Sequence, residues 1–587
     1  MALTPLTDPL GVQRAAHLLR RACFGATKQQ IDQFAAMTPQ QAIAVLFDSS
    51  LPDPVLPIDP NTGVTWITLD PSTDVEDFNY EDRLMRWHIG QMMSAGIPEN
   101  QSLAYAFREK LVFFMHTHFT TKRSVVSNSR SLYYQMALFR FFAFDKDDIV
   151  TPSGDPMIPD TVVELNFKEL TKKLSVENAM LVFLDGRYNV KGSPNENYAR
   201  ELLELYAIGR GLEGAIPDPQ YEGDYINYTE HDVQEGAKVF SGFVNDDNFL
   251  NIDEDTGIPR GVIRGGGLIA GSHDNTTKTF SERLGNATVT PDPALLNAGE
   301  PTEESILDEI SQLIEIVYAQ QETALYTCRK LYRAFVYHEI NETIQSGIIQ
   351  DLADVFSANN FKIQPVLEAL FTSQEFYEGV PGYIDDSFGG IIKSPLDLVI
   401  GFNRSFGITV PDSTTDLEGF YNVTNDLLDA VGSQGMDYYE PFEVAGYPAY
   451  HQYPIYHRNW ITTNYLTRRY NYIRNKIGNG LTPDPDLVDI LQFTKDNFSS
   501  VGANARDLVV ELTKYFLPVS GMIAFDDTNS EITTERLNYF LNALYDDGDP
   551  DPDAAWTTRW NSSSPDAGGQ LLNLFNAMLQ SPEYQLM

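Results

Sequence analysis

The sequence predicts a mainly α-helical protein, a large multi-helix assembly that carries a small β-hairpin insertion. Two observations lead to this fold class. Along most of the 587 residues, apolar side chains recur at the i, i+3, i+4, i+7 spacing of an amphipathic helix. Between residues 243 and 293, in contrast, Gly, Asn, Asp and Thr accumulate, and short β-like runs occur at residues 261–264 and 287–290.

The helical pattern can be followed along the whole chain. Residues 38–47, for example, open with Thr38 as a capping residue and Pro39 in the first turn. Pro- and Asp-rich stretches at 51–71 and 546–553 predict surface loops. The expected helices are residues 12–23, 38–47, 81–93, 103–119, 129–142, 193–209, 303–336, 348–356, 363–372, 396–406, 463–477, 505–516, 533–544 and 569–579, with one more that begins after Thr229.

The charge balance excludes some classes of partner. Acidic side chains number 82 and basic ones 41, which gives a formal net charge of −41. Because nucleic-acid affinity depends on Lys and Arg displacing counterions, we expect no nucleic-acid partner, and no binding to anionic lipid. Two interpretations of the acidity stay open, a solubilising surface and loose binding of a divalent metal such as calcium by surface carboxylates.

The chain has no apolar stretch of about 18 residues, so direct membrane insertion is not expected. Residues 1–25 lack the apolar core of a signal peptide, and we expect that any export to the cell envelope or beyond would depend on a partner. The two cysteines, Cys23 and Cys328, are expected as buried thiols on helices, with a disulfide as the alternative.

Residues 193–209, SPNENYARELLELYAIG, form the most informative stretch. Ser193 and Glu196 have the spacing of a capping box, and Gly209 suits the end of the helix. One interpretation is an amphipathic helix whose Glu196, Arg200 and Glu204 form ion pairs four residues apart. The other is a carboxylate-rich face that lines a cleft and performs acid–base chemistry. The candidate catalytic residues are Arg200, Glu201 and Glu204, with His273.

Histidines provide the candidate metal ligands. His116 and His118 lie in an apolar helix about 200° apart, so both can bind one metal only if the helix ends there. A hydrogen-bonded core position is the alternative for at least one of them. His273 and Asp274 lie in a Gly-rich loop where they could act as ligand or base. The candidate metal site is His116, His118, Glu204 and Asp274.

Two further segments have more than one interpretation. Residues 446–460, GYPAYHQYPIYHRNW, include His451 and His457 among many aromatic residues, which is typical of a packed surface or of a platform for sugar rings. The acidic loop at 251–257 has alternating carboxylates but lacks the glycine position and final Glu of a calcium-binding EF-hand. No P-loop, HExxH, nucleophile elbow or paired CxxC motif occurs.

Several blocks, taken in order, resemble the domain-of-unknown-function 1800 family. The opening block AHLLRRACFG is followed by REKLVFFMHTHF, in which Met115 stands where the family usually has Trp. The segment at 446–450 is similar to a branch of the family seen in Bacteroidetes. The remaining blocks are residues 184–186, 194–205, 228–243, 273–278, 328–333, 393–395 and 581–587.

The resemblance runs almost from end to end, and it implies a single helical domain over residues 1–587 with the insertion inside it. Genes of this family often neighbour a second family, domain of unknown function 1501, which resembles sulfatases and phosphatases and carries export signals. This implies a protein partner and a role at the cell envelope, in the handling of extracellular polysaccharide. The alternative is a metal-assisted or carboxylate-based hydrolase with its site around the helix at 193–209.

Overall fold

The computed structural model describes residues 3–68, 77–153, 160–378, 390–451, 453–479, 487–528, 530–546 and 548–587. Within these ranges the chain forms helices α1 to α26 and four two-stranded sheets, which confirms a mainly α fold with little β structure. None of the helices in the described part combines the length and the apolarity that a membrane span needs. Residues 69–71 and 547 of the predicted loops lie outside the described residues.

Helix α5 is the buried centre of the N-terminal third. Every residue from Ser102 to His118 is buried, because this sequence is apolar on nearly all sides and helices α1, α3, α4 and α7 pack around it. The elements of this third are α1 (Gly11–Cys23), α2 (Lys28–Ala35), α3 (Pro39–Leu46), α4 (Asp77–Met92), η1 (Glu99–Gln101), α5 (Ser102–His118), α6 (Arg123–Val126), α7 (Ser129–Phe141), β1 (Ile149–Thr151), β2 (Thr161–Val163), α8 (Phe167–Leu174), α9 (Asn178–Phe183) and η2 (Gly186–Tyr188).

The middle third carries the β insertion. Its two antiparallel pairs, β3 with β4 and β5 with β6, lie where the β-like runs were predicted. The elements are α10 (Asn197–Glu201), the π-helical turn η3 (Leu202–Tyr206), α11 (Glu230–Val239), β3 (Phe243–Val244), β4 (Val262–Ile263), β5 (Lys278–Thr279), η4 (Glu282–Leu284), β6 (Thr288–Val289), α12 (Glu303–Tyr318), α13 (Gln321–Phe335), α14 (Glu342–Ile344), η5 (Gln345–Ile349), α15 (Gln350–Ala358), α16 (Ile363–Phe371) and α17 (Gln374–Glu378).

The C-terminal third is again helical. Helices α18 and α19 pack on one another and α19 packs on α4, whereas α22 to α26 pack mainly among themselves and α23 contacts α1. The elements are α18 (Pro395–Ser405), α19 (Leu417–Ser433), α20 (Pro448–His451), η6 (Tyr456–Ile461), α21 (Thr463–Arg474), β7 (Ile477–Gly478), β8 (Val488–Asp489), α22 (Ile490–Phe498), α23 (Ala505–Phe516), α24 (Thr534–Leu544), α25 (Pro552–Ser562), α26 (Pro565–Leu579) and η7 (Glu583–Gln585).

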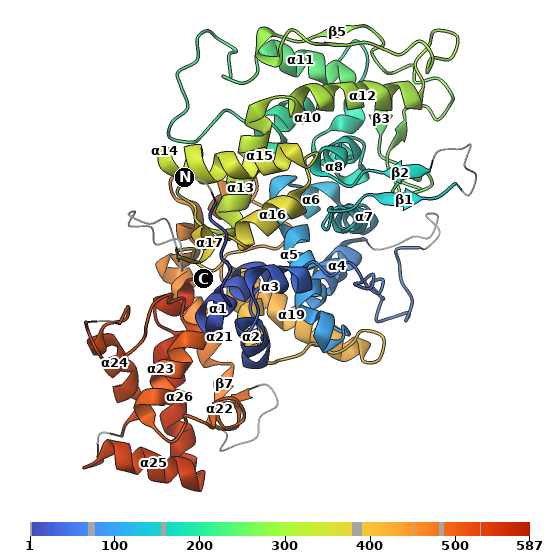
Figure 1. The fold of residues 1–587 in the computed structure, drawn as a ribbon. Coiled ribbons are helices and arrows are strands. Elements are labelled where there is room, and N and C mark those ends of the chain that lie inside the picture. The colour runs from blue at the N-terminus through green and yellow to red at the C-terminus, as the bar shows by residue number, and fades with distance from the viewer. Residues whose placement is uncertain are drawn as a thin grey trace.

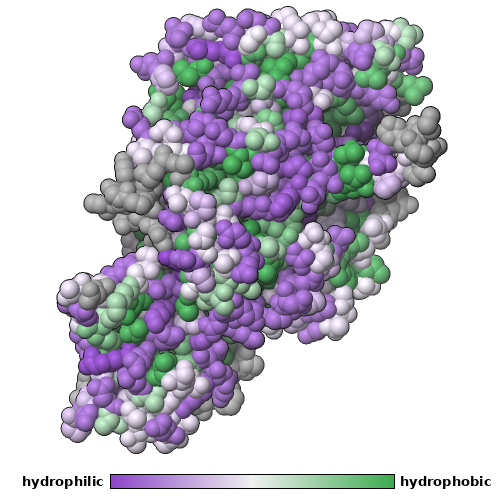
Figure 2. Space-filling view, viewed as in Figure 1, coloured by the Kyte–Doolittle hydropathy of each residue, from purple (hydrophilic) through white to green (hydrophobic). Residues whose placement is uncertain are grey.

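These parts share one connected cluster of buried apolar side chains that runs from Leu6 to Tyr584. Figure 1 shows α10 to α12 with the insertion at the top, α4, α5 and α19 in the middle, and α22 to α26 at the lower left. Hydrophilic residues cover most of the face seen in Figure 2, and hydrophobic ones are scattered among them. A polar surface of this kind agrees with the charge of −41.

Two helix predictions need correction. The helix expected at 303–336 is two helices, because the chain breaks at Ala319 and Gln320 between α12 and α13. The helix expected to begin at Ser193 begins at Asn197 with Glu196 as its N-cap. Ser193 instead belongs to a turn in which its N–H donates to the carbonyl of Val190 at 3.0 Å, so the predicted capping box does not form. The two cysteines are free and buried, as expected.

Candidate functional site

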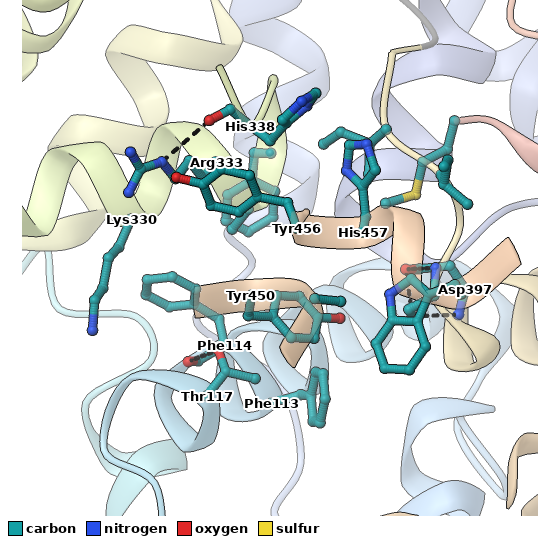
Figure 3. A pocket seen from close by; sticks show the side chains of 18 of the residues that line it. Phe113, Phe114, Thr117, Lys330, Arg333, His338, Asp397, Tyr450, Tyr456 and His457 are labelled. Atoms are coloured by element: carbon teal, nitrogen blue, oxygen red, sulfur yellow. Dashed lines mark hydrogen bonds between the residues drawn. The ribbon is translucent and has the colours of Figure 1, made fainter. Parts of the chain in front are cut away.

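A cavity lies where helices α5, α13 and α18 meet the segment 448–461. Its volume is about 70 Å³, which is smaller than the roughly 300–1,000 Å³ of most small-molecule sites. Its walls are mainly aromatic: α5 contributes Phe114, and the segment contributes Tyr450, Tyr456 and Trp460 (Figure 3). The exposed fractions of Tyr456 and Trp460 are 5% and 4%, so the rings are packed walls of a recess and not an open platform.

Polar side chains interrupt this aromatic wall. Three come from α5, three from α13 and the residues after it, and the others from the start of α18 and from η6. Figure 3 shows the imidazoles of His338 and His457 above Tyr450, with Lys330 and Arg333 to their left. The polar lining residues are Lys110, Thr117, His118, Lys330, Arg333, His338, Ser394, Asp397 and His457.

Two of the cations are neutralised by carboxylates. Arg333 donates to both carboxylate oxygens of Glu213, at 3.0 and 2.7 Å, and its Nε donates to the carbonyl of His338 at 3.2 Å. Lys110 forms a buried ion pair with Asp397, whose carboxylate also accepts from the Ser394 hydroxyl at 2.7 Å. Such pairs fix the walls of the cavity, because each charge keeps a partner away from water.

Lys330 is the third cation of the cavity. Its Nζ donates to the backbone carbonyl of Leu205 at 2.7 Å and lies 4.8 Å from the centre of the Tyr326 ring. Burial lowers the pKa of Lys330 to about 7, with Arg333 lowering it further and Glu213 acting in the opposite direction. The amine therefore changes its charge near neutral pH.

The two histidines form a neutral pair. The rings of His338 and His457 have centroids 4.4 Å apart at 73°, and each residue is 8% exposed. Burial lowers the pKa of His338 to about 4, and burial together with His338 lowers the pKa of His457 to about 3. Both rings are consequently uncharged at physiological pH and can offer one donor and one acceptor each. The side chain of His451 lies outside the described part of the structure.

The π turn of the helix at 193–209 binds two of the residues that line this cavity. In the turn the N–H of Ala207 bonds to the carbonyl of Leu202 at 2.9 Å, five residues back. The carbonyls at the end of the turn lack helical partners, and cavity residues satisfy them. Lys330 binds the carbonyl of Leu205, and Nε2 of His118 donates to that of Tyr206 at 2.8 Å. π turns are frequent at functional sites.

The candidate catalytic carboxylates lie on this same helix. Glu196 and Arg200 form the predicted ion pair at 2.9 Å, and Arg200 also pairs with Glu230 at 2.8 Å. The predicted pair of Arg200 with Glu204 does not form: Glu204 pairs with Arg210 at 2.8 Å. The wider spacing of the π turn rotates Glu204 away from Arg200, so its carboxylate meets the residue that follows the helix.

Glu201 has the perturbed pKa that an acid–base role requires. Burial raises its pKa to about 7, and the neighbouring carboxylate of Glu204 raises it further, while Arg200 and Arg210 act in the opposite direction. Of the four candidate catalytic residues, the structure brings Arg200, Glu201 and Glu204 into one charged neighbourhood. The fourth, His273, binds elsewhere.

His273 belongs to a buried ionic cluster between the insertion and α12. Its Nε2 lies 3.2 Å from the carboxylate of Glu309, and its Nδ1 donates to the carbonyl of Ser241 at 2.8 Å. Glu309 also pairs with Lys278, and all three side chains are completely buried. Asp274, next in sequence, accepts from the N–H and hydroxyl of Thr276, at 3.1 and 2.6 Å. The cluster joins two elements of the fold.

The histidines of α5 have different neighbours from one another. His116 stacks on Tyr439 with ring centroids 3.7 Å apart, and within the described residues neither of its ring nitrogens has a hydrogen-bond partner. Burial lowers the pKa of His116 to about 3. His118 lines the cavity and binds Tyr206. One member of the predicted metal site thus reaches the cavity, and the other lies against an aromatic ring.

The four predicted metal ligands do not share a cluster. In the described part of the chain, no group of three or more His, Cys, Asp or Glu side chains has the arrangement of a metal site. In the loop at 251–257, Asp253 binds Lys173 and Arg260, at 2.8 and 3.0 Å. Protein cations therefore occupy the carboxylate that a calcium ion would need.

A comparison with protein families decides the assignment. The family model described as "Protein of unknown function (DUF1800)" matches residues 17–586. The chain belongs to this family. Searches of curated proteins and of solved structures found no match to this DUF1800 chain.

Some of the family blocks recognised in the sequence line the cavity. Block 328–333 contains Lys330 and Arg333, block 393–395 begins α18 beside Asp397, and block 108–119 is the α5 wall. Sequence reasoning did not select Lys330, Arg333 or His338 as site residues in this DUF1800 chain. The signal that could have found them is the pair Lys330 and Arg333, two basic side chains three residues apart on a largely buried helix. Packing alone does not require charged side chains there.

Proposed function

We propose that this protein handles carbohydrate at the cell envelope, and that the cavity at α5, α13 and 448–461 binds a sugar unit of an extracellular polysaccharide. The observation that carries this proposal is the combination, in one recess, of aromatic walls with neutral and charged hydrogen-bonding groups. A sugar ring has hydroxyl groups on its rim and C–H groups on its faces, so its chemistry matches both kinds of wall.

The physical reason lies in the two surfaces of a pyranose. Its C–H faces are apolar and pack on aromatic rings, whose negative faces attract the slightly positive hydrogens. Its hydroxyls lose water on entering a recess and need partners there. His338 and His457, both neutral, offer donors and acceptors, and Asp397 and Thr117 offer oxygen atoms. Tyr450 and Trp460 supply the aromatic faces.

Affinity electrophoresis in gels that contain soluble polysaccharides tests the proposal. Wild-type protein should be retarded by at least one polysaccharide, and Tyr450→Leu, which keeps an apolar side chain but removes the ring, should lose about tenfold in affinity, or about 1.4 kcal/mol. Tyr539→Leu is the control, since Tyr539 lies on α24 and is 52% exposed. Sugar binding in the cavity would be refuted if wild type and Tyr450→Leu migrated equally, with the same mobility in gels with and without polysaccharide.

We further propose that the protein works with a secreted partner of the domain-of-unknown-function 1501 type, which would provide the route to the envelope. The family relationship supports this, and the acidic, mainly hydrophilic surface is compatible with a complex outside the cell. Co-purification from the native organism, with the chain tagged and cell fractions separated, tests both parts. Recovery of the chain alone from the cytoplasmic fraction would contradict them.

A second candidate function, a carboxylate-based hydrolase at the helix 193–209, is favoured by Glu201. A carboxyl group with a pKa of about 7 beside an ion-paired carboxylate is the arrangement in which one group donates a proton and the other stays ionised. Release of reducing ends from the bound polysaccharide would measure it. Glu201→Gln should abolish release, whereas Glu196→Gln should not. Hydrolysis unchanged in Glu201→Gln would exclude this role.

A further inference from the structure

The lining of the cavity is basic although the protein is strongly acidic. Of its charged side chains, Lys110, Lys330 and Arg333 are cations and Asp397 is the acid, against a net charge of −41 for the chain. Because Asp397 and Glu213 neutralise Lys110 and Arg333, the charge left over in the recess is that of protonated Lys330, and low-dielectric walls strengthen its attraction for an anion. This distribution favours an anionic ligand over a neutral one.

Lys330 is the cation that has no counter-ion. Lys110 pairs with Asp397, and Arg333 pairs with Glu213. No carboxylate in the described part of the chain lies within ion-pair distance of Lys330, whose Nζ instead donates to the carbonyl of Leu205 at 2.7 Å. That carbonyl accepts one of the three protons of an ammonium group, so two donors stay available for a ligand.

We propose that the sugar unit bound in the cavity is anionic, and that its carboxylate or sulfate group binds the ammonium of Lys330. This inference rests on the proposed sugar-binding function and specifies its substrate class. The anion would lie beside α13, and the rest of the ring would reach the aromatic wall formed by Phe114 and Tyr450. The carbonyl of Leu205 in the π turn holds the ammonium from the other side, as the negative end of a helix does for a cation.

The groups around Lys330 determine how binding depends on pH. On its own helix lie Arg333, which disfavours a second positive charge, and Tyr326, whose ring contacts the amine. Glu213 favours the charged form from the loop after the π turn. Across the cavity, the pKa of His338 is about 4 and that of His457 about 3, while the pKa of Tyr456 is about 12.

Burial thus brings the pKa of Lys330, at about 7, close to neutrality. An anion binds the protonated form, so its apparent affinity follows the protonated fraction of the free protein. That fraction falls from about one half at pH 7 to about one hundredth at pH 9, which predicts about 50-fold weaker binding of an anionic sugar. Binding of a neutral sugar should not change in this way.

Isothermal titration calorimetry with three matched trisaccharides tests the inference. The probes are a galacturonic acid trimer, a sulfated galactose trimer and a neutral galactose trimer, each titrated at pH 7 and pH 9. The expected result is preference for one of the two anionic trimers, which distinguishes carboxylate from sulfate, with a loss of about 50-fold at pH 9. Lys330→Met should abolish this preference at pH 7.

The variant Lys330→Arg distinguishes an effect of the positive charge from an effect of misfolding. Because arginine stays protonated at pH 9, this variant should keep the preference for the anion and lose its pH dependence. Lys146→Met, which alters a lysine 54% exposed at the surface, is the control. Equal, pH-independent affinity for all three trimers would overturn the anionic site and leave sugar binding in place. Absence of binding to every trimer and to every polysaccharide in the gels would overturn both proposals.

Discussion

The buried cluster of His273, Lys278 and Glu309 leads to a quantitative prediction. Replacing Lys278 by Met removes the ammonium and keeps most of the side-chain volume, so the completely buried carboxyl group of Glu309 loses this partner and keeps His273 as its neighbour at 3.2 Å. An ion pair at contact distance contributes about 5 kcal/mol at an effective dielectric constant of about 20. The contact of Glu309 with His273 is present with and without Lys278, and removal of one partner of a buried ion pair costs about 3–5 kcal/mol. We expect Lys278→Met to lower the free energy of unfolding by about 3–4 kcal/mol.

The double variant Lys278→Met with Glu309→Leu should be much less affected. It leaves no unpaired carboxylate, and exchange of a buried ion pair for apolar groups of similar volume is often close to neutral. We expect a loss of about 1–2 kcal/mol, so the two substitutions are not additive. Urea unfolding followed by far-ultraviolet circular dichroism measures both losses, and hydrogen exchange across β5 and β6 reports the local effect.

Two results would refute this reasoning. A loss below about 1 kcal/mol in Lys278→Met would mean that the ion pair contributes little, as exposed pairs do. A double variant as unstable as the sum of its parts would mean that Lys278 and Glu309 act independently. The expected pattern would assign the polar residues at 273–278 a role in attaching the insertion to α12.

Three further predictions concern single residues. Glu201→Gln should stabilise the protein by about 1–2 kcal/mol at pH 8 and leave its stability at pH 5 nearly unchanged. The reason is that the pKa of Glu201 in the folded protein, about 7, lies above its unfolded value, so wild type loses stability as the pH rises through it. Thermal melting at both pH values measures this. Gly209→Ala should lower the free energy of unfolding by about 2–4 kcal/mol, since Gly209 has φ +63° and an added Cβ would lie 2.5 Å from the ring of Tyr326. Gly285→Ala, with φ +72° and open space around the added Cβ, should lower it by about 1 kcal/mol. The midpoints of urea unfolding distinguish the two variants. His116→Phe should be neutral or stabilising by about 1 kcal/mol, because it removes two unpaired nitrogens and keeps the ring; metal bound by wild type and lost from this variant would contradict it.

Local sequence signals identified most of the fold. Thr38 with Pro39 predicted the start of α3, and the capping box at Thr229 and Asp232 predicted the start of α11. The signal at Ser193 failed because the chain forms a turn there, closed by a bond from Ser193 to Val190. A capping motif marks a helix start when the following backbone is free to enter the helix, and the tertiary structure determines whether it is.

The candidate site was less accessible to sequence reasoning. Periodicity could show that the helix at 193–209 is amphipathic, and it correctly paired Glu196 with Arg200. It could not show the π turn, in which Glu204 pairs with Arg210, because a helical wheel assumes 3.6 residues per turn throughout. The cavity also needs α13 and the segment 448–461, which lie more than a hundred residues apart in the chain and meet only in the folded protein.

The π turn also constrains the length of the polypeptide. It places the carbonyls of Leu205 and Tyr206 where Lys330 and His118 can donate to them. Removal of one residue between Arg200 and Leu205 would restore ordinary α-helical winding and turn both carbonyls by about 100° around the helix axis. The cavity would then lose two of its attachments without any change in its own lining. In this segment, the number of residues matters as much as their chemistry.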